Sequence, residues 1–60
     1  MSEYAVEAKY TERYGYEEVA CEESLEEGIE QLNCYRNNMP QYPHRLVRVY
    51  DDGDREVLDY

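Results

Sequence analysis

The fold of this 60-residue chain is decided by residues 24–40, which read Ser-Leu-Glu-Glu-Gly-Ile-Glu-Gln-Leu-Asn-Cys-Tyr-Arg-Asn-Asn-Met-Pro. Ser24 is followed three residues later by Glu27, and this spacing is the capping box that marks the N-terminus of a helix. Two asparagines that tolerate a left-handed cap conformation precede Pro40, which cannot continue a helix. The pattern therefore predicts a helix over about residues 25–37.

One face of the predicted helix is apolar. At 100° per residue, a narrow stripe is formed by Leu25, Ile29, Leu32 and Arg36, with Tyr35 at its flank. Gly28 also lies beside the stripe, although glycine costs a helix roughly 1 kcal/mol relative to alanine. We therefore expect the helix backbone to approach a sheet closely at Gly28.

Two strands are predicted before the helix. Over residues 4–10, polar and apolar residues alternate as in a half-buried strand. The inner side of this strand comprises Tyr4, Val6, Ala8 and Tyr10. Residues 17–21 read as a second strand, with Val19 and Cys21 on its inner face, and Gly15 supplies the hairpin loop. Strands this close in sequence are usually antiparallel neighbours.

Two further strands are predicted after the helix, over residues 44–50 and 55–60. The turn between them is Asp51-Asp52-Gly53-Asp54. A three-residue loop would place Val47 opposite Val57, whereas a two-residue loop would place Val47 opposite Leu58. Both registers fit the sequence.

The element order ββαββ predicts one α+β domain over residues 1–60, a small antiparallel sheet with one helix across a face. Such a short chain buries only about 60% of its unfolded surface. We therefore expect a homodimer or a bound partner to supplement the core. No signal peptide and no long apolar run are present, which predicts a cytoplasmic protein without a membrane partner.

Charge is distributed unevenly along the chain, which has fifteen acidic and six basic residues and a net charge of −9. Residues 1–30 hold ten acids and two bases, residues 31–50 hold three arginines and no acid, and residues 51–60 hold five acids and one arginine. Anionic surfaces would repel this chain, which argues against direct binding to nucleic acid or to an anionic membrane.

Five glutamates lead into and line the helix face opposite the apolar stripe: Glu22, Glu23, Glu26, Glu27 and Glu30. In helical geometry they span about 12 Å, or about one carboxylate per 2.4 Å. Duplex DNA carries about one charge per 1.7 Å of its axis. A solvated face would account for the acids, but mixed charge would serve solubility equally well. We therefore predict a surface that competes with nucleic acid for a basic groove on another protein.

Tyrosine is a favoured interface residue because it is large, stiff and able to hydrogen-bond at its tip. Tyr14 and Tyr16, on either side of Gly15, are therefore candidate contact residues. The other tyrosines include the only aromatic side chains available to fill the core, since the chain has no Phe or Trp.

The sequence predicts no enzyme, no cofactor and no metal site. His44, the single histidine, is expected at the surface where a strand begins. Cys21 and Cys34 could form one disulfide at most, and we expect free thiols, with Cys21 a small core residue. The residues 51–54 do not match the EF-hand spacing, and a hairpin turn accounts for them without calcium.

The segments Tyr-Arg-Asn-Asn-Met-Pro (35–40) and Pro-His-Arg-Leu-Val-Arg-Val (43–49) are similar to small phage proteins. In size, charge and layout the whole chain resembles the short acidic proteins of phages and mobile elements, among them anti-CRISPR and anti-restriction proteins. This resemblance implies an inhibitor in the host cytoplasm that binds a CRISPR effector or similar nuclease and blocks its DNA-binding surface.

The alternative is a structural or regulatory accessory domain without enzymatic activity. In this interpretation the chain is a homodimer, and the region of Arg36, Arg45 and Arg48 meets the acidic surface of a second copy.

Overall fold

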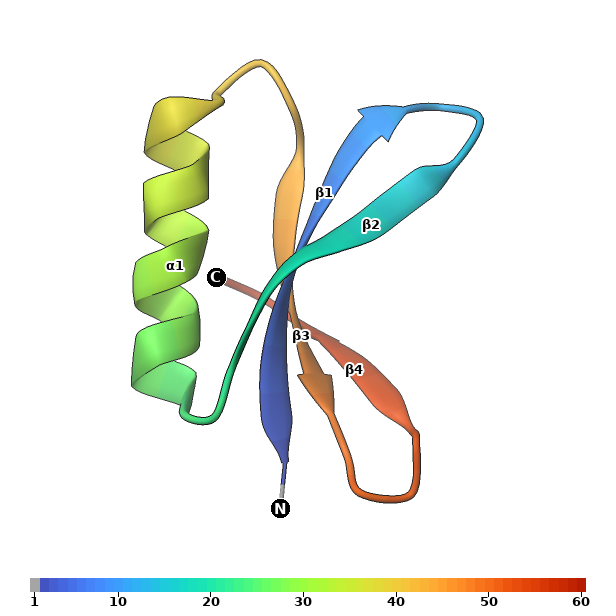
Figure 1. Ribbon diagram of the computed structural model, residues 1–60, viewed down its shortest axis with the longest axis vertical. Helices are drawn as coiled ribbons and strands as arrows, with labels where there is room; N and C mark the ends of the chain where they lie inside the picture. The colour runs from blue at the N-terminus through green and yellow to red at the C-terminus, as the bar shows by residue number, and fades with distance from the viewer. Residues whose placement is uncertain (1) are drawn as a thin grey trace.

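The computed structural model describes residues 2–60 and has the element order ββαββ (Figure 1). The elements are β1 (Glu3–Thr11), β2 (Gly15–Glu22), α1 (Leu25–Asn38), β3 (His44–Val49) and β4 (Arg55–Leu58). The four strands form one antiparallel sheet in the order β2-β1-β3-β4. The predicted α+β class is confirmed, and the helix extends one residue beyond the prediction.

The helix begins and ends through local contacts that the sequence encodes. The Oγ atom of Ser24 accepts a hydrogen bond from the Glu27 backbone N–H at 3.2 Å and donates one to the Glu27 carboxylate at 2.9 Å. At the other end, the Met39 N–H donates to the Tyr35 carbonyl at 2.9 Å. Within residues 2–60, α1 is the only helix, and its length and hydropathy do not suit it to crossing a membrane.

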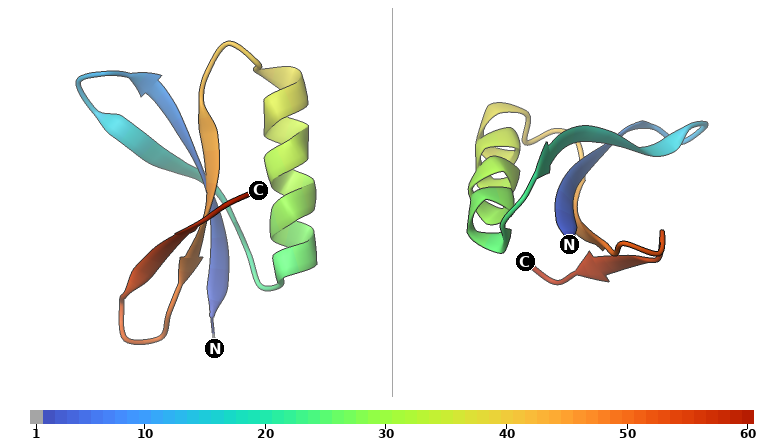
Figure 2. Two further views of the ribbon diagram at one scale, coloured as in Figure 1. Left: turned by 180° about the vertical axis from the view of Figure 1, so that it is seen from behind. Right: turned by 60° about the horizontal axis from the view of Figure 1, so that its bottom comes forward.

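The helix covers one face of the sheet, and the core lies between them (Figures 1 and 2). Val6, Leu32 and Leu46 are fully buried there. Around them pack partly buried residues: Tyr4, Val19, Ala20, Leu25, Ile29, Tyr35 and Leu58. The predicted close approach at Gly28 is confirmed, because a Cβ atom at this position would lie 2.9 Å from Tyr4 Cβ and 3.2 Å from Leu46 Cδ1.

A β-bulge in β2 makes the prediction for Cys21 wrong. Val6 pairs with Ala20, but the next residue of β1, Glu7, pairs with Glu18, so β2 contains an extra residue at this point. The extra residue changes the alternation of faces along the strand. Val19 still packs on the core, whereas Cys21 lies opposite Ala5 and is exposed.

The hairpin between β3 and β4 has the three-residue loop, with Val47 opposite Val57. The Tyr50 N–H donates to the Asp54 carbonyl at 2.8 Å, and the Gly53 N–H donates to the Tyr50 carbonyl at 3.0 Å. Gly53 has a φ of 94°, which glycine adopts without the steric cost that other residues incur. A turn closed by such a residue selects this register.

Candidate functional site

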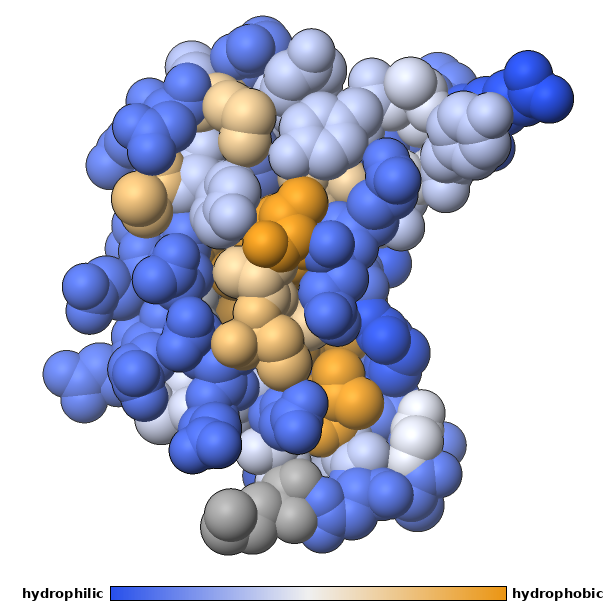
Figure 3. All heavy atoms as spheres, in the orientation of Figure 1, coloured by the Kyte–Doolittle hydropathy of each residue, from blue (hydrophilic) through white to orange (hydrophobic). Residues whose placement is uncertain are grey.

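The acidic surface predicted from the sequence is exposed. Glu23, Glu26, Glu27 and Glu30 are exposed and Glu22 is half-buried. Among residues 2–60, none of the five forms an ion pair. Figure 3 shows hydrophilic residues over most of the side of the molecule where α1 lies, and hydrophobic residues gather beside it in a narrow band.

The spacing of these five carboxylates is helical only in part. Glu26, Glu27 and Glu30 belong to α1, whereas Glu22 ends β2 and Glu23 lies in the connection before the helix. The expected linear charge density assumed helical spacing for all five glutamates, and only three of them have it. The other two extend the acidic surface from the helix N-terminus toward the sheet.

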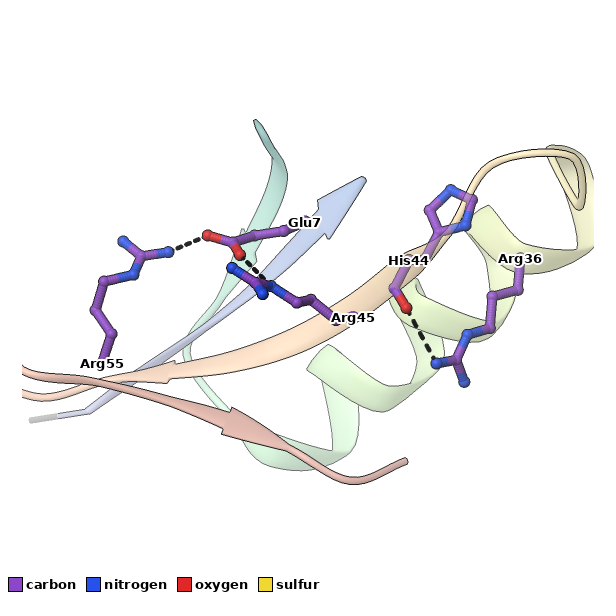
Figure 4. Close-up of polar contacts among 5 residues, drawn as sticks. All are labelled: Glu7, Arg36, His44, Arg45 and Arg55. Carbon is purple, nitrogen blue, oxygen red and sulfur yellow. Dashed lines mark hydrogen bonds and ion pairs between the residues drawn. The ribbon is translucent and has the colours of Figure 1, made fainter. Parts of the chain in front are cut away.

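A buried carboxylate lies on the sheet face that the helix does not cover. Glu7 is only 5% exposed. Arg45 Nε donates to its Oε1 atom at 2.7 Å, and Arg55 Nη2 donates to its Oε2 atom. Figure 4 shows the two guanidinium groups approaching Glu7 from β3 and β4. Long side chains, rather than a second helix, cover this face.

The remaining basic side chains also make contacts within the chain with groups other than the five glutamates. Arg36 donates to the His44 carbonyl at 3.2 Å (Figure 4), and Lys9 pairs with Glu12 at 3.2 Å. The guanidinium of Arg48 lies 4.8 Å from the Tyr50 ring centroid, and that of Arg13 lies 5.6 Å from the Tyr14 ring centroid. Each of the six basic residues of the chain thus has a contact within residues 2–60 other than an ion pair with one of the five glutamates.

The structure does not bring Tyr14 and Tyr16 to the acidic surface. Both lie in the hairpin between β1 and β2, whose tip projects away from the helix in Figures 1 and 2. Tyr14 is 68% exposed. Tyr16 is half-buried, and the Arg45 guanidinium lies 3.9 Å from its ring centroid. Tyr16 therefore packs on Arg45, which binds Glu7, and of the two tyrosines only Tyr14 is open for contact with a partner.

The prediction that His44 lies at the surface is wrong. His44 is 7% exposed, lies opposite Ala8, and has its ring centroid 6.1 Å from that of Tyr35. It is buried because β3 is an inner strand of the sheet, which the sequence order alone does not reveal. Neither imidazole nitrogen has a hydrogen-bond partner among residues 2–60.

No metal-binding cluster of three or more His, Cys, Asp or Glu residues occurs within residues 2–60. A hollow of about 260 Å³ lies between the end of β1 and the connection from α1 to β3. The Tyr10 and Tyr42 rings meet edge to face there at 4.9 Å, so Tyr10 packs on the connection. The charged residues of the hollow, Lys9 and Glu12, pair with each other.

Cys21 has a carboxylate neighbour that keeps it protonated. Its thiol donates to Glu3 Oε2 at 3.2 Å. This hydrogen bond, with some desolvation and the nearby charges of Glu3, Glu18 and Glu22, raises the pKa of Cys21 to about 11. The contact therefore stabilises the fold below the pKa of the unfolded thiol, and the contribution is lost as the pH rises through about 11.

We expect Cys21 to react slowly with iodoacetamide despite its exposure. In a Cys34→Ser variant at pH 8, alkylation of the folded protein should be at least about tenfold slower than that of the urea-unfolded chain, because the thiolate is the nucleophile. The Glu3→Gln variant serves as the control and should speed the reaction of the folded protein. Equal rates in the folded and unfolded states would contradict the role of Glu3.

Comparison with models of protein families, with curated proteins and with solved structures finds no match for this chain.

Proposed function

We propose that this protein is a phage-type inhibitor whose acidic face occupies the basic nucleic-acid groove of a host defence complex, such as a CRISPR effector or a similar nuclease. One observation carries the proposal: five glutamates gather at the start of α1 without an ion pair among residues 2–60, while all six basic side chains are engaged elsewhere. If this surface served only solubility, basic side chains of the same chain could have formed ion pairs with its glutamates.

The arrangement has a cost in the free protein that a basic partner would remove. Glu26 and Glu30 are four residues apart on α1, and like charges at this spacing destabilise a helix by a few tenths of a kcal/mol. Glu26 and Glu27 lie in the first turn, where the helix dipole offsets part of that cost. A groove lined with Lys and Arg would turn this repulsion into attraction and would speed association.

The resemblance to anti-CRISPR proteins supports the choice of partner class, since such inhibitors bind nucleases that hold DNA in basic channels. Tyr14, at the far end of the molecule, would anchor the inhibitor beyond the groove. In this proposal the charged surface and the exposed tyrosine would contact different parts of the partner.

Reversal of charge at Glu26, Glu27 and Glu30 to lysine is expected to abolish inhibition. The variant loses the bond from Ser24 to the Glu27 carboxylate and the favourable charge of the first turn. Lysine has a helix propensity close to that of glutamate, and Ser24 still caps the backbone N–H of residue 27, so α1 should remain folded. Affinity capture from a host lysate identifies the target, and displacement of DNA from that target measures inhibition. We expect at least a hundredfold loss for the triple variant, or about 2.7 kcal/mol. Binding of the unmodified protein should weaken steeply with salt.

A matched control separates the location of the charge from its total. Reversal of the charge at Glu12, Glu17 and Glu18, which are exposed on the hairpin of β1 and β2, changes the net charge by the same amount. Inhibition should then change by less than about tenfold. Retained inhibition in the helix variant would exclude DNA mimicry by this face. An equal loss in both variants would mean that only net charge matters.

The alternative of a homodimeric accessory domain has less support from the geometry. Arg45 pairs across the sheet with Glu7 and Arg48 with Tyr4, so the two arginines lie on opposite faces of β3. The region of Arg36, Arg45 and Arg48 is therefore not one surface that could meet the acidic face of a second copy.

A further inference from the structure

The strand β4 lies at an edge of the sheet and has an outward row of backbone groups. The Tyr50 N–H donates to the Asp54 carbonyl, so these residues form a hydrogen-bonded pair. Hydrogen-bonded and non-bonded pairs alternate along an antiparallel ladder. The backbone groups of Glu56 and Leu58 therefore point toward β3, and those of Arg55 and Val57 point outward. In the right-hand view of Figure 2, no other described element lies beyond β4.

The two edges of the sheet differ in how they would meet another strand. The edge strand β2 has Glu17, Glu18 and Glu22 exposed or half-buried, and these charges discourage pairing between two copies. In β4, Val57 is 57% exposed. Although β4 is short and also carries Arg55 and Glu56, Val57 gives this edge an exposed apolar position without a charge to discourage a further strand.

We propose that two copies of this chain pair through antiparallel β4 strands, with the two-fold axis at Val57. In such a dimer the outward backbone groups of one β4 strand bond to the outward backbone groups of the other. Within β4 this condition allows four registers, in which the two-fold axis passes through residue 55, 56, 57 or 58. An axis at Arg55 or Glu56 brings like charges together, and an axis at Leu58 places Val57 opposite Asp59. Only the axis at Val57 pairs valine with valine and Arg55 with Asp59 of the second copy.

This pairing joins the two sheets into one and extends β4 by Asp59. It depends on few hydrogen bonds, since β4 has only four residues, so the dimer should be weak. Each copy carries a charge of −9, and salt screens their mutual repulsion. Dimer formation should therefore strengthen with salt, in contrast to binding of a basic partner by the acidic face. The face of α1 stays exposed in the dimer.

Sedimentation equilibrium of the full chain tests the surface. Dimers should appear between roughly 10 µM and 1 mM protein. The Val57→Lys variant, at an exposed position, should dissociate at least about tenfold more readily. The Glu18→Lys variant on the opposite edge should not dissociate more readily. A monomer throughout this range, or a dimer unaffected by Val57→Lys, would overturn the proposal.

Disulfide trapping tests the register in a chain that carries Cys21→Ser and Cys34→Ser. Hydrogen-bonded residues have Cα atoms about 5.5 Å apart, within the range of a disulfide. The Val57→Cys variant should therefore form a covalent dimer on mild oxidation. The Glu56→Cys variant should not, because residue 56 faces residue 58 of the second copy. Faster trapping of Glu56→Cys would overturn the register, and trapping of neither variant would overturn the pairing.

Discussion

The Glu7→Gln variant is expected to lose about 2–4 kcal/mol of unfolding free energy. Glu7 is 5% exposed and accepts hydrogen bonds from both Arg45 and Arg55. A glutamine keeps the volume but removes the charge, so two guanidinium groups remain beside a neutral amide. Their side chains are 36% and 47% exposed, and partial hydration holds the loss below that of a fully buried pair.

This loss is large for a chain of 60 residues, whose total stability is expected to be roughly 3–9 kcal/mol. Urea unfolding followed by circular dichroism measures it, since small single domains usually unfold in one step. The Glu12→Gln variant is the matched control, because Glu12 pairs with Lys9 but its side chain is 94% exposed. It should lose less than about 1 kcal/mol. Equal losses for the two variants would contradict a structural role for Glu7.

The Gly28→Val variant is expected to lose about 3 kcal/mol or more, because its side chain would enter a contact that is already closed. Even a Cβ atom at this position would lie 2.9 Å from Tyr4 Cβ, which the backbone of β1 holds in place. The helix would have to move away from the sheet and open the core around Leu32. The higher helix propensity of valine offsets only a few tenths of a kcal/mol.

The Asn33→Val variant places the same side chain at an exposed position of α1. Valine and asparagine have similar helix propensities, so its stability should change by less than about 0.5 kcal/mol. The difference between the two variants in urea unfolding then isolates the contact at residue 28. A Gly28→Val protein as stable as the unmodified chain would mean that the helix can shift without cost.

Elements whose signals lie within a few residues can be predicted from the sequence. The helix needs only Ser24 and Glu27 at its start and Pro40 beyond its end. The close approach at Gly28 can also be predicted, because glycine weakens a helix and its lack of a side chain is useful where the helix backbone packs on a sheet. The turn before Arg55 can also be predicted, although the register of the two strands that it joins depends on the conformation of Gly53.

Predictions fail where a residue's surroundings depend on distant parts of the chain. Strict alternation assigns Cys21 to the core, and a bulge of one residue moves it to the exposed face. The place of His44 at the beginning of a strand assigns it to the surface, yet that strand lies inside the sheet beneath α1. Neither outcome has a local signal, because strand order and bulges depend on pairing between segments.

Of the candidate site, the positions of Glu26, Glu27 and Glu30 follow from helix periodicity, but the lack of ion-pair partners for these glutamates does not. Arg45 and Arg55 come from segments 38 and 48 residues away from Glu7. Because both arginines bind the buried carboxylate of Glu7, neither of them neutralises the acidic surface.

Local propensity and charge order along the chain thus establish the helix, the turns and the excess of acid before α1. The partners of the charges and the outward edge of β4 follow only from tertiary structure, because both depend on which strands become neighbours.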